Sequence, residues 1–281
     1  MPIAGVAAGI FSALSFGAGD FAGAVASRRA GALVVVAGAH GIGLVVLLVA
    51  AIIFRPPFPD GAGIGLGLLA GVAGMLGLAA LYRGMSLGSM GLVTALSGSG
   101  SLAIPLAAGA MLGQSVGPWQ LAGVGCAAAA AVAASGASRT ELGQLALLLA
   151  GAAAVAFGTW YVLIDLAAAA GDPLWALVMS RAASSGLAAA VAFGRWGGTA
   201  FPLRIVAAAG IFDVGGNALF VVAGDTLPVG LAAALTGMYP VVTMLLARVL
   251  LGERLPRLGQ LGVLLAILGV VLISLGEPGS R

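Results

Sequence analysis

Ionisable side chains interrupt the apolar runs of this sequence at five places. They are Asp20, His40, Arg83, Arg181 and Asp213. An ionisable group inside a hydrocarbon layer costs roughly 2.5–3.5 kcal/mol on insertion scales, so it usually faces a polar partner or a cavity. Carboxylates and guanidinium groups in such places can bind a charged substrate, and an imidazole can also carry protons near neutral pH. The sequence therefore predicts binding or proton-transfer chemistry inside an apolar chain.

Polar and aromatic side chains share helix faces with these groups. Ser12, Phe16 and Asp20 are spaced by four residues, and residues four apart lie on one face of a helix. Asp213 and Asn217 have the same spacing. Aromatic rings beside a charge would suit a partly apolar substrate through stacking or cation–π contacts. The predicted substrate-binding residues are Phe16, Asp20, His40, Tyr82, Ser97, Ser101, Trp160, Tyr161, Asp213, Asn217 and Tyr239.

Several of these residues also have a purely structural interpretation. Asp20 can form an ion pair with an arginine of another helix. Trp160 and Tyr161 can anchor a helix at the membrane interface, where aromatic side chains are enriched. Arg83 and Arg181 can either meet a substrate carboxylate or extend to the membrane surface.

An enzyme is the first alternative to a binding protein. The segment 17–20 reads Gly-Ala-Gly-Asp, and together with Asp213 it resembles the paired aspartates of intramembrane aspartyl proteases. Their chemistry needs two carboxylates about 3 Å apart that share a proton. In those proteases the Gly-x-Gly-Asp aspartate comes second in the chain, whereas Asp20 comes first, which argues against a protease. One histidine, one cysteine and no lysine leave neither a metal-ligand set nor a Gly-Lys-Ser/Thr phosphate loop, so we expect no metal, cofactor or enzymatic activity.

The composition excludes an ordinary soluble domain. Of the 281 residues, 61% are hydrophobic and 7% are charged, and the mean hydropathy is +1.17. Soluble domains carry about 25% charged residues because their surfaces face water. Lipid tolerates an apolar surface, and the 47 glycines suit helices that pack closely in a bilayer. The formal net charge is +3, without a basic stripe that would bind nucleic acid.

Apolar runs of the length that crosses a bilayer, roughly 20 residues, recur along the whole chain. The predicted spans are 3–25, 32–54, 62–84, 90–112, 118–136, 142–165, 174–194, 204–223, 229–250 and 257–275. Proline and glycine mark the breaks between them. We therefore predict an all-α membrane protein of ten transmembrane helices. No basic residue precedes the first span, so we expect it to be retained rather than cleaved.

The arginines predict the orientation of these spans. Eight of them lie on one side, in or beside the loops that join spans one and two, five and six, seven and eight, and nine and ten. Arg55 and Arg281 lie on the other side. Because positively charged residues stay in the cytoplasm, we expect both termini outside, in a bacterial inner membrane.

The two halves of the chain resemble each other. Segment 92–98 (LVTALSG) aligns with 231–237 (LAAALTG), and 112–114 (LGQ) aligns with 251–253 (LGE). These matches divide the chain into repeats 1–137 and 138–281. A repeat of five helices has an odd number of crossings, so its second copy is inverted in the membrane. Inverted repeats are typical of secondary transporters, whose halves move around a central site.

The second copy resembles a known family. Residues 251–255 (LGERL), the following 259–262 (GQLG) and the apolar helix after them are similar to the repeat end of EamA-type members of the drug/metabolite transporter superfamily. In the first copy Gln114 and Ser115 replace the glutamate and arginine. The resemblance covers essentially the whole chain and extends to bacterial amino-acid and metabolite exporters, including those for aromatic amino acids. It implies export of a small metabolite through a central cavity.

The sequence as a whole predicts a secondary transporter that exports amino acids, aromatic ones included, or related amphipathic compounds by alternating access. A multidrug or cation exporter, a channel and a membrane assembly protein are the alternatives. Transport could be driven by protons through Asp20 or His40, or could follow the substrate gradient. One chain carries both repeats, so a monomer is sufficient, with the lipid bilayer and a small molecule as its partners.

Overall fold

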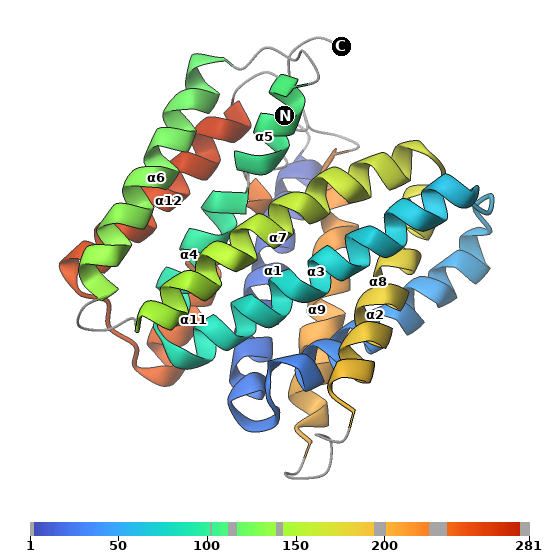
Figure 1. Ribbon diagram of the computed structural model, residues 1–281, viewed down its shortest axis with the longest axis horizontal. Helices are drawn as coiled ribbons and strands as arrows, with labels where there is room; N and C mark the ends of the chain where they lie inside the picture. Colours follow the sequence, from blue (N-terminus) through green and yellow to red (C-terminus); the bar gives the residue numbers. More distant parts are fainter. Residues whose placement is uncertain are drawn as a thin grey trace.

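The computed structural model describes residues 3–101, 103–111, 117–138, 143–193, 201–224 and 235–275, and every regular element within these ranges is a helix (Figure 1). The first half contains α1 (Ile3–Ala30), α2 (Ala32–Phe54), α3 (Gly61–Leu87), α4 (Met90–Ser101), α5 (Ala103–Met111) and α6 (Pro118–Ser138). The second half contains α7 (Gln144–Ala169), α8 (Pro173–Val191), α9 (Leu203–Gly224), α11 (Tyr239–Leu251) and α12 (Arg257–Leu275).

The predicted all-α membrane class is confirmed for the described part of the chain. Six of its helices, namely α1, α2, α3, α7, α8 and α9, are long and apolar enough to cross a membrane. Shorter apolar helices include α11 and α12. Helices α4 and α5 together occupy the predicted span 90–112. Residues 112–116, 139–142 and 225–234, with the Gln114-Ser115 signature and the start of the ninth span, lie outside the described residues.

Local sequence signals fix several helix ends. Asp60 caps α3, because its Oδ1 accepts a hydrogen bond of 2.8 Å from the backbone N–H of Gly63. Asp172 caps α8 through the N–H of Leu174, also at 2.8 Å, and Pro173 occupies the first helical position, where a missing N–H costs nothing. At the C-terminal end of α11, Gly252 adopts a left-handed conformation with φ of 68°, which glycine reaches without strain.

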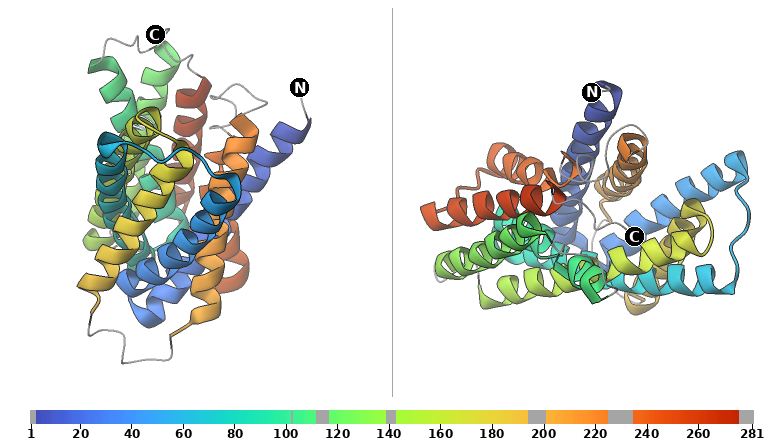
Figure 2. Two further views of the ribbon diagram at one scale, coloured as in Figure 1. Left: turned by 90° about the vertical axis from the view of Figure 1, so that its right-hand side faces the viewer. Right: turned by 90° about the horizontal axis from the view of Figure 1, so that it is seen from above.

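Four helices of the first half each pack along a helix of the second half. α1 packs along α9, α3 along α7, α2 along α8, and α6 along α12. Figure 1 shows α3 crossing beside α7 and α6 beside α12. Seen from above, α6 and α12 lie on one side and α2 and α3 on the other (Figure 2). The interface between the halves is therefore spread through the whole bundle.

Glycines allow these helices to approach closely. A Cβ atom on Gly216 of α9 would lie 2.8 Å from Cγ of Phe16, and one on Gly77 of α3 would lie 2.7 Å from Cδ1 of Phe157. The same kind of contact thus joins α1 to α9 and α7 to α3. On Gly71 of α3 a Cβ would overlap the carbonyl oxygen of Ser180. Small residues permit such backbone contact between membrane helices, where packing drives association.

The largest cluster of buried apolar side chains lies at one end of the bundle. This end is where α1, α3 and α11 finish and where α2, α4, α7, α9 and α12 begin. The cluster includes Val35 and Val36 of α2, Tyr82 of α3, Met90 of α4 and Val206 of α9. We call this the arginine-rich end, because it carries the exposed Arg28, Arg29, Arg83, Arg204, Arg248, Arg254 and Arg257.

Nearer the opposite end, packing among the described residues is sparser. One small cluster joins Ala8 to Ala223, and another joins Leu47, Val178 and Val214. Both involve α9, with α1 in the first and with α2 and α8 in the second. The bundle is therefore held together mainly at its arginine-rich end.

Glu253, within the 251–255 motif, joins the two halves at that end. Its carboxylate accepts hydrogen bonds from the hydroxyl of Ser89 and, at 3.1 Å, from the N–H of Met90. These groups lie at the N-terminus of α4, where unpaired N–H groups favour a negative charge. Arg28, Gly88, Ser89, Leu251 and Glu253 line a cavity of about 380 Å³ beside this contact.

We expect Gly71→Ala to lower the stability of the protein by about 1–3 kcal/mol, because the new methyl group would force α3 away from the backbone of α8. Gly65→Ala is the matched control on the same helix, since a Cβ there meets no atom within 4 Å. The Gly65→Ala variant should be as stable as the wild type or more stable by up to about 1 kcal/mol, because alanine has the better helix propensity. Thermal unfolding in detergent measures both, and equal midpoints would contradict the close contact.

We expect Glu253→Ala to cost about 0.5–2 kcal/mol, as the loss of other N-terminal helix caps does. Ser89→Ala should cost less without Glu253 than with it, because residues that share one contact do not act additively. Part of its loss remains, since Oγ of Ser89 also accepts a hydrogen bond of 3.4 Å from the N–H of Leu92. Thermal unfolding of both single variants and the double variant measures this coupling. Arg254→Ala, at the exposed next residue, is the control. Strictly additive losses would argue against the cap.

Candidate functional site

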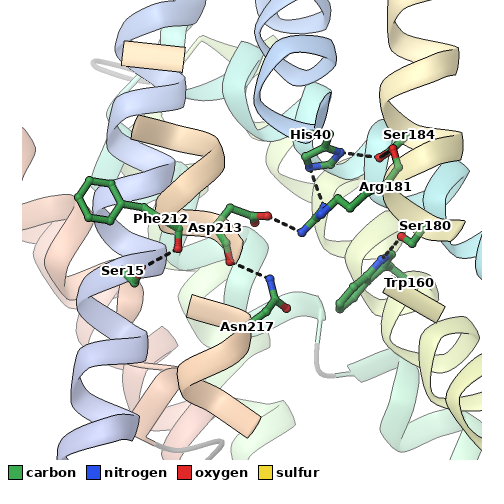
Figure 3. A network of polar contacts seen from close by, with 9 residues as sticks. All are labelled: Ser15, His40, Trp160, Ser180, Arg181, Ser184, Phe212, Asp213 and Asn217. Atoms are coloured by element: carbon green, nitrogen blue, oxygen red, sulfur yellow. Dashed lines mark hydrogen bonds and ion pairs between the residues drawn. The ribbon is translucent and has the colours of Figure 1, made fainter. Parts of the chain in front are cut away.

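A buried ion pair lies between α8 and α9. Nη2 of Arg181 contacts Oδ2 of Asp213, with side chains that are 7% and 23% exposed (Figure 3). Within the described ranges Arg181 is buried and the other arginines are all exposed. A buried guanidinium is tolerated only when a counter-ion and hydrogen-bond acceptors surround it. Asp213 supplies the charge.

His40 of α2 extends this pair into a network. Its Nε2 lies 2.8 Å from Nη1 of Arg181, and its Nδ1 lies 2.6 Å from Oγ of Ser184. A guanidinium can only donate hydrogen bonds, so Nε2 must accept and the ring proton must reside on Nδ1. Ser184 accepts from Nδ1–H and donates to the carbonyl oxygen of Arg181 at 3.2 Å. His40 is therefore neutral here, and the charges of Arg181 and Asp213 cancel.

Further hydrogen bonds attach this network to its surroundings. Nδ2 of Asn217 donates to the carbonyl oxygen of Asp213 at 2.8 Å, one helical turn earlier. On the other side, Nε1 of Trp160 donates to Oγ of Ser180 at 3.1 Å, which ties α7 to α8. Figure 3 shows Trp160 and Ser180 beside the Arg181 chain. The network thus draws its members from α2, α7, α8 and α9.

Asp20 stands apart from these hydrogen bonds. Its half-buried side chain forms no hydrogen bond or ion pair with any other residue that the structure describes. It interacts electrostatically with Asp213, and also with the tyrosines Tyr82, Tyr161 and Tyr239. The structure therefore brings these groups from α1, α3, α7, α9 and α11 into one region.

Aromatic rings lie in the same region of the bundle as this carboxylate. Phe16, one turn before Asp20, meets the ring of Tyr239 edge-on with centroids 6.4 Å apart. Trp160 and Tyr161 form a second edge-on pair at 5.2 Å. Tyr161 is 41% exposed, so part of its ring is open to a ligand. A carboxylate with aromatic neighbours suits a ligand that has both charge and apolar surface.

The predicted residues Ser97 and Ser101 lie differently. Both are buried in α4, and their hydroxyls donate to carbonyl oxygens of the same helix, to Thr94 at 3.1 Å and to Gly98 at 2.8 Å. Gly98 in turn leaves room for the hydroxyl of Tyr239, which a Cβ would overlap. The structure thus places this face of α4 against α11, and the substrate-binding role of the two serines stays a prediction.

The sequence named Arg181 as an ionisable residue within a span but did not include it among the predicted substrate-binding residues, as it did Asp213 and His40, and it did not indicate Ser184. The signal for Arg181 is present in the repeat. His40 and Arg181 are separated by as many residues as Phe16 and Phe157, so they occupy equivalent positions in α2 and α8. α2 and α8 are equivalent helices of the two repeats, and they pack against each other. Residues at equivalent positions in them therefore face each other. Arg83, by contrast, is exposed at the arginine-rich end.

The geometry does not support the two enzyme-like alternatives. An aspartyl dyad needs two carboxylates that share a proton. Here Asp213 is engaged by Arg181, and no hydrogen bond joins it to Asp20 within the described structure. The described residues also contain no group of three histidine, cysteine or acidic side chains that could hold a metal ion. The described site consists of one charge-neutral network and one half-buried carboxylate, Asp20, that forms no hydrogen bond or ion pair with another described residue.

Comparisons with known proteins agree with this fold. The model of the EamA-like transporter family matches the chain twice, over residues 3–136 and 144–275. No curated protein matches it. Nine chains of solved structures match, and one of them, a crystal structure, aligns with a TM-score of 0.63 over 95% of both chains at 18% sequence identity. At that identity the likeness shows the fold alone.

We expect Asp213→Leu to destabilise the protein by about 3–5 kcal/mol, because it leaves the guanidinium of Arg181 buried without its counter-ion. Adding Arg181→Met should recover most of that loss, since both charges then disappear together. Denaturant titration of the purified protein in detergent measures the three variants. Asp165→Leu, at an exposed position of α7, is the control. A double variant less stable than Asp213→Leu would show that the two side chains do not compensate each other.

Proposed function

The chain belongs to the EamA-like transporter family, and on that premise we propose that it is a secondary transporter that exports amino acids or related amphipathic metabolites. The observation that carries this proposal is the meeting of an unpaired carboxylate, aromatic rings and a charge-neutral network within the bundle. Groups of this kind bind and release a small molecule without changing its covalent bonds. Family membership supports a transporter, and the substrate class is our inference from the site.

The architecture we propose is a pair of inverted five-helix repeats, 1–137 and 138–281. Reciprocal packing supports it, because α1 lies along α9 of the other half and α7 lies along α3. Two further observations support the repeat. Phe16 and Phe157 each pack against a glycine of the other half, and His40 and Arg181 occupy equivalent positions. The two family matches fall one in each half. Such repeats allow one half to rock against the other around a shared site.

Both halves contribute to the proposed substrate site. Asp20 and Phe16 come from α1, while Tyr161 and Tyr239 come from α7 and α11. Because the site spans the interface, relative movement of the halves would change its access. The contrast between the packed arginine-rich end and the sparser opposite end supports alternating access. We further propose that the arginine-rich end faces the cytoplasm, which places this conformation closed on the cytoplasmic side.

We expect saturable efflux of labelled aromatic and aliphatic amino acids from proteoliposomes that contain the protein, with unlabelled substrate competing. A carrier saturates because each molecule must occupy the site, whereas leakage through lipid does not. Imposing a pH gradient separates two mechanisms: acceleration indicates proton coupling, and no effect indicates facilitated transport. In the coupled case, Asp20→Asn should abolish the acceleration if Asp20 carries the proton.

Protein-free liposomes give the background, and Asp60→Asn, at the exposed N-cap of α3, is the matched control for replacing a carboxylate outside the site. Efflux no faster than this background, with folded protein confirmed by thermal unfolding, would remove amino acids as substrates. Pore-like flux that does not saturate would favour a channel.

A further inference from the structure

We propose that Asp20, with the rings of Phe16, Tyr161 and Tyr239, forms a binding site for an organic ammonium group, so that the preferred substrate is an amphipathic amine. The inference rests on the proposed transporter function, and among the amphipathic metabolites proposed there it favours amines over amino acids as the preferred substrates. It follows from the charges that are left after every ion pair of the site has been assigned.

The first step is that no cation of the described protein pairs with Asp20. Arg181, the buried arginine, is already bound to Asp213 and His40, and its remaining Nε is enclosed without a partner. The other arginines in the described ranges are exposed. A carboxylate within an apolar bundle is costly to ionise unless a cation meets it, so Asp20 takes up either a proton or a cationic ligand.

The second step is the surroundings of Asp20. Phe16 lies one turn away on α1 and contacts Tyr239, while Tyr161 and Tyr239 interact electrostatically with Asp20 and with each other. Aromatic faces attract cations within about 6 Å of the ring centre, and most strongly those that are poorly hydrated. Rings from α1, α7 and α11 would thus contact the carbon atoms and the charge of an ammonium ligand together.

The third step excludes other ligands. A divalent metal ion needs several oxygen ligands, and Asp20 offers a single carboxylate among aromatic rings. An anion would meet a negative charge. The carboxylate of a zwitterionic amino acid would find no available guanidinium, because Arg181 is occupied and enclosed. A monocationic amine is the ligand whose charges all find partners.

The test compares three probes with one aromatic body: 2-phenylethylamine, phenylalanine and the uncharged 2-phenylethanol. Calorimetry on the purified full-length protein in detergent gives their Kd values. We expect the amine to bind most tightly. Asp20→Asn should weaken amine binding about tenfold to a hundredfold, as expected for loss of a charged contact, and should leave the alcohol within about twofold.

Two further variants make the result specific. Asp60→Asn removes an exposed carboxylate at the start of α3, keeps the helix cap because asparagine can also accept the N–H of Gly63, and should leave the Kd of the amine unchanged. Tyr161→Ala should weaken amine binding about twofold to thirtyfold, whereas Tyr161→Phe, which keeps the ring, should weaken it less. Thermal unfolding confirms that each variant is folded. If Asp20→Asn does not fold, the two Tyr161 variants decide the question.

Amine binding that is equal in the wild type and in Asp20→Asn would overturn the proposal, as would tighter binding of phenylalanine or of the alcohol. Transport is scored separately in proteoliposomes. Asp20-dependent amine binding without amine efflux would uphold the site and reject the proposed transporter. Saturable amino-acid efflux with Asp20-independent amine binding would uphold the transporter and reject the site.

Discussion

The ion pair between Arg181 and Asp213 is the interaction on which the interior of this protein depends. A guanidinium within a membrane bundle must be neutralised and hydrogen-bonded, so α8 and α9 can lie only where the two side chains meet. His40 adds α2 to the same constraint, because its unprotonated Nε2 must point at Arg181. The pair also sets the charge of the site: once Asp213 is compensated, Asp20 is the half-buried carboxylate left without a hydrogen bond or ion pair among the described residues.

Packing around this network differs along the membrane normal. Within the predicted span 90–112, every residue of 90–99 in α4 is buried, whereas no α5 residue whose side chain is described is buried. The first segment lies at the arginine-rich end and the second toward the opposite end. One predicted span therefore passes from a tight core into looser surroundings. On the proposed cycle, Asp20 lies between a closed end and an opposite end where the described residues pack loosely. Opening that opposite end would therefore break few of the described contacts.

The sequence predicted the six long apolar helices of the described structure, and their contacts only in part. Hydrophobic length places these six, because crossing a bilayer requires about 20 apolar residues whatever their neighbours are. The ionisable residues were identified in the same way, because each of them interrupts an apolar run. Which of them pair depends on helix packing: Asp213 and not Asp20 meets Arg181. The contact of Glu253 with Ser89 joins residues 164 positions apart and follows no local pattern, so the motif at 251–255 indicated a family and not a cap.

That cap has a consequence for the proposed motion. Glu253 of the second half holds the start of α4 in the first half, at the tightly packed end. If the halves move to open this end, these hydrogen bonds must exchange with water or with other partners. The aligned repeats place Gln114 where Glu253 stands and Pro228 where Ser89 stands. An uncharged amide attracts a helix N-terminus less than a carboxylate does, and proline has neither a hydroxyl nor an N–H to donate. The hydrogen-bonding groups of this cap are therefore not repeated in the sequence of the other copy.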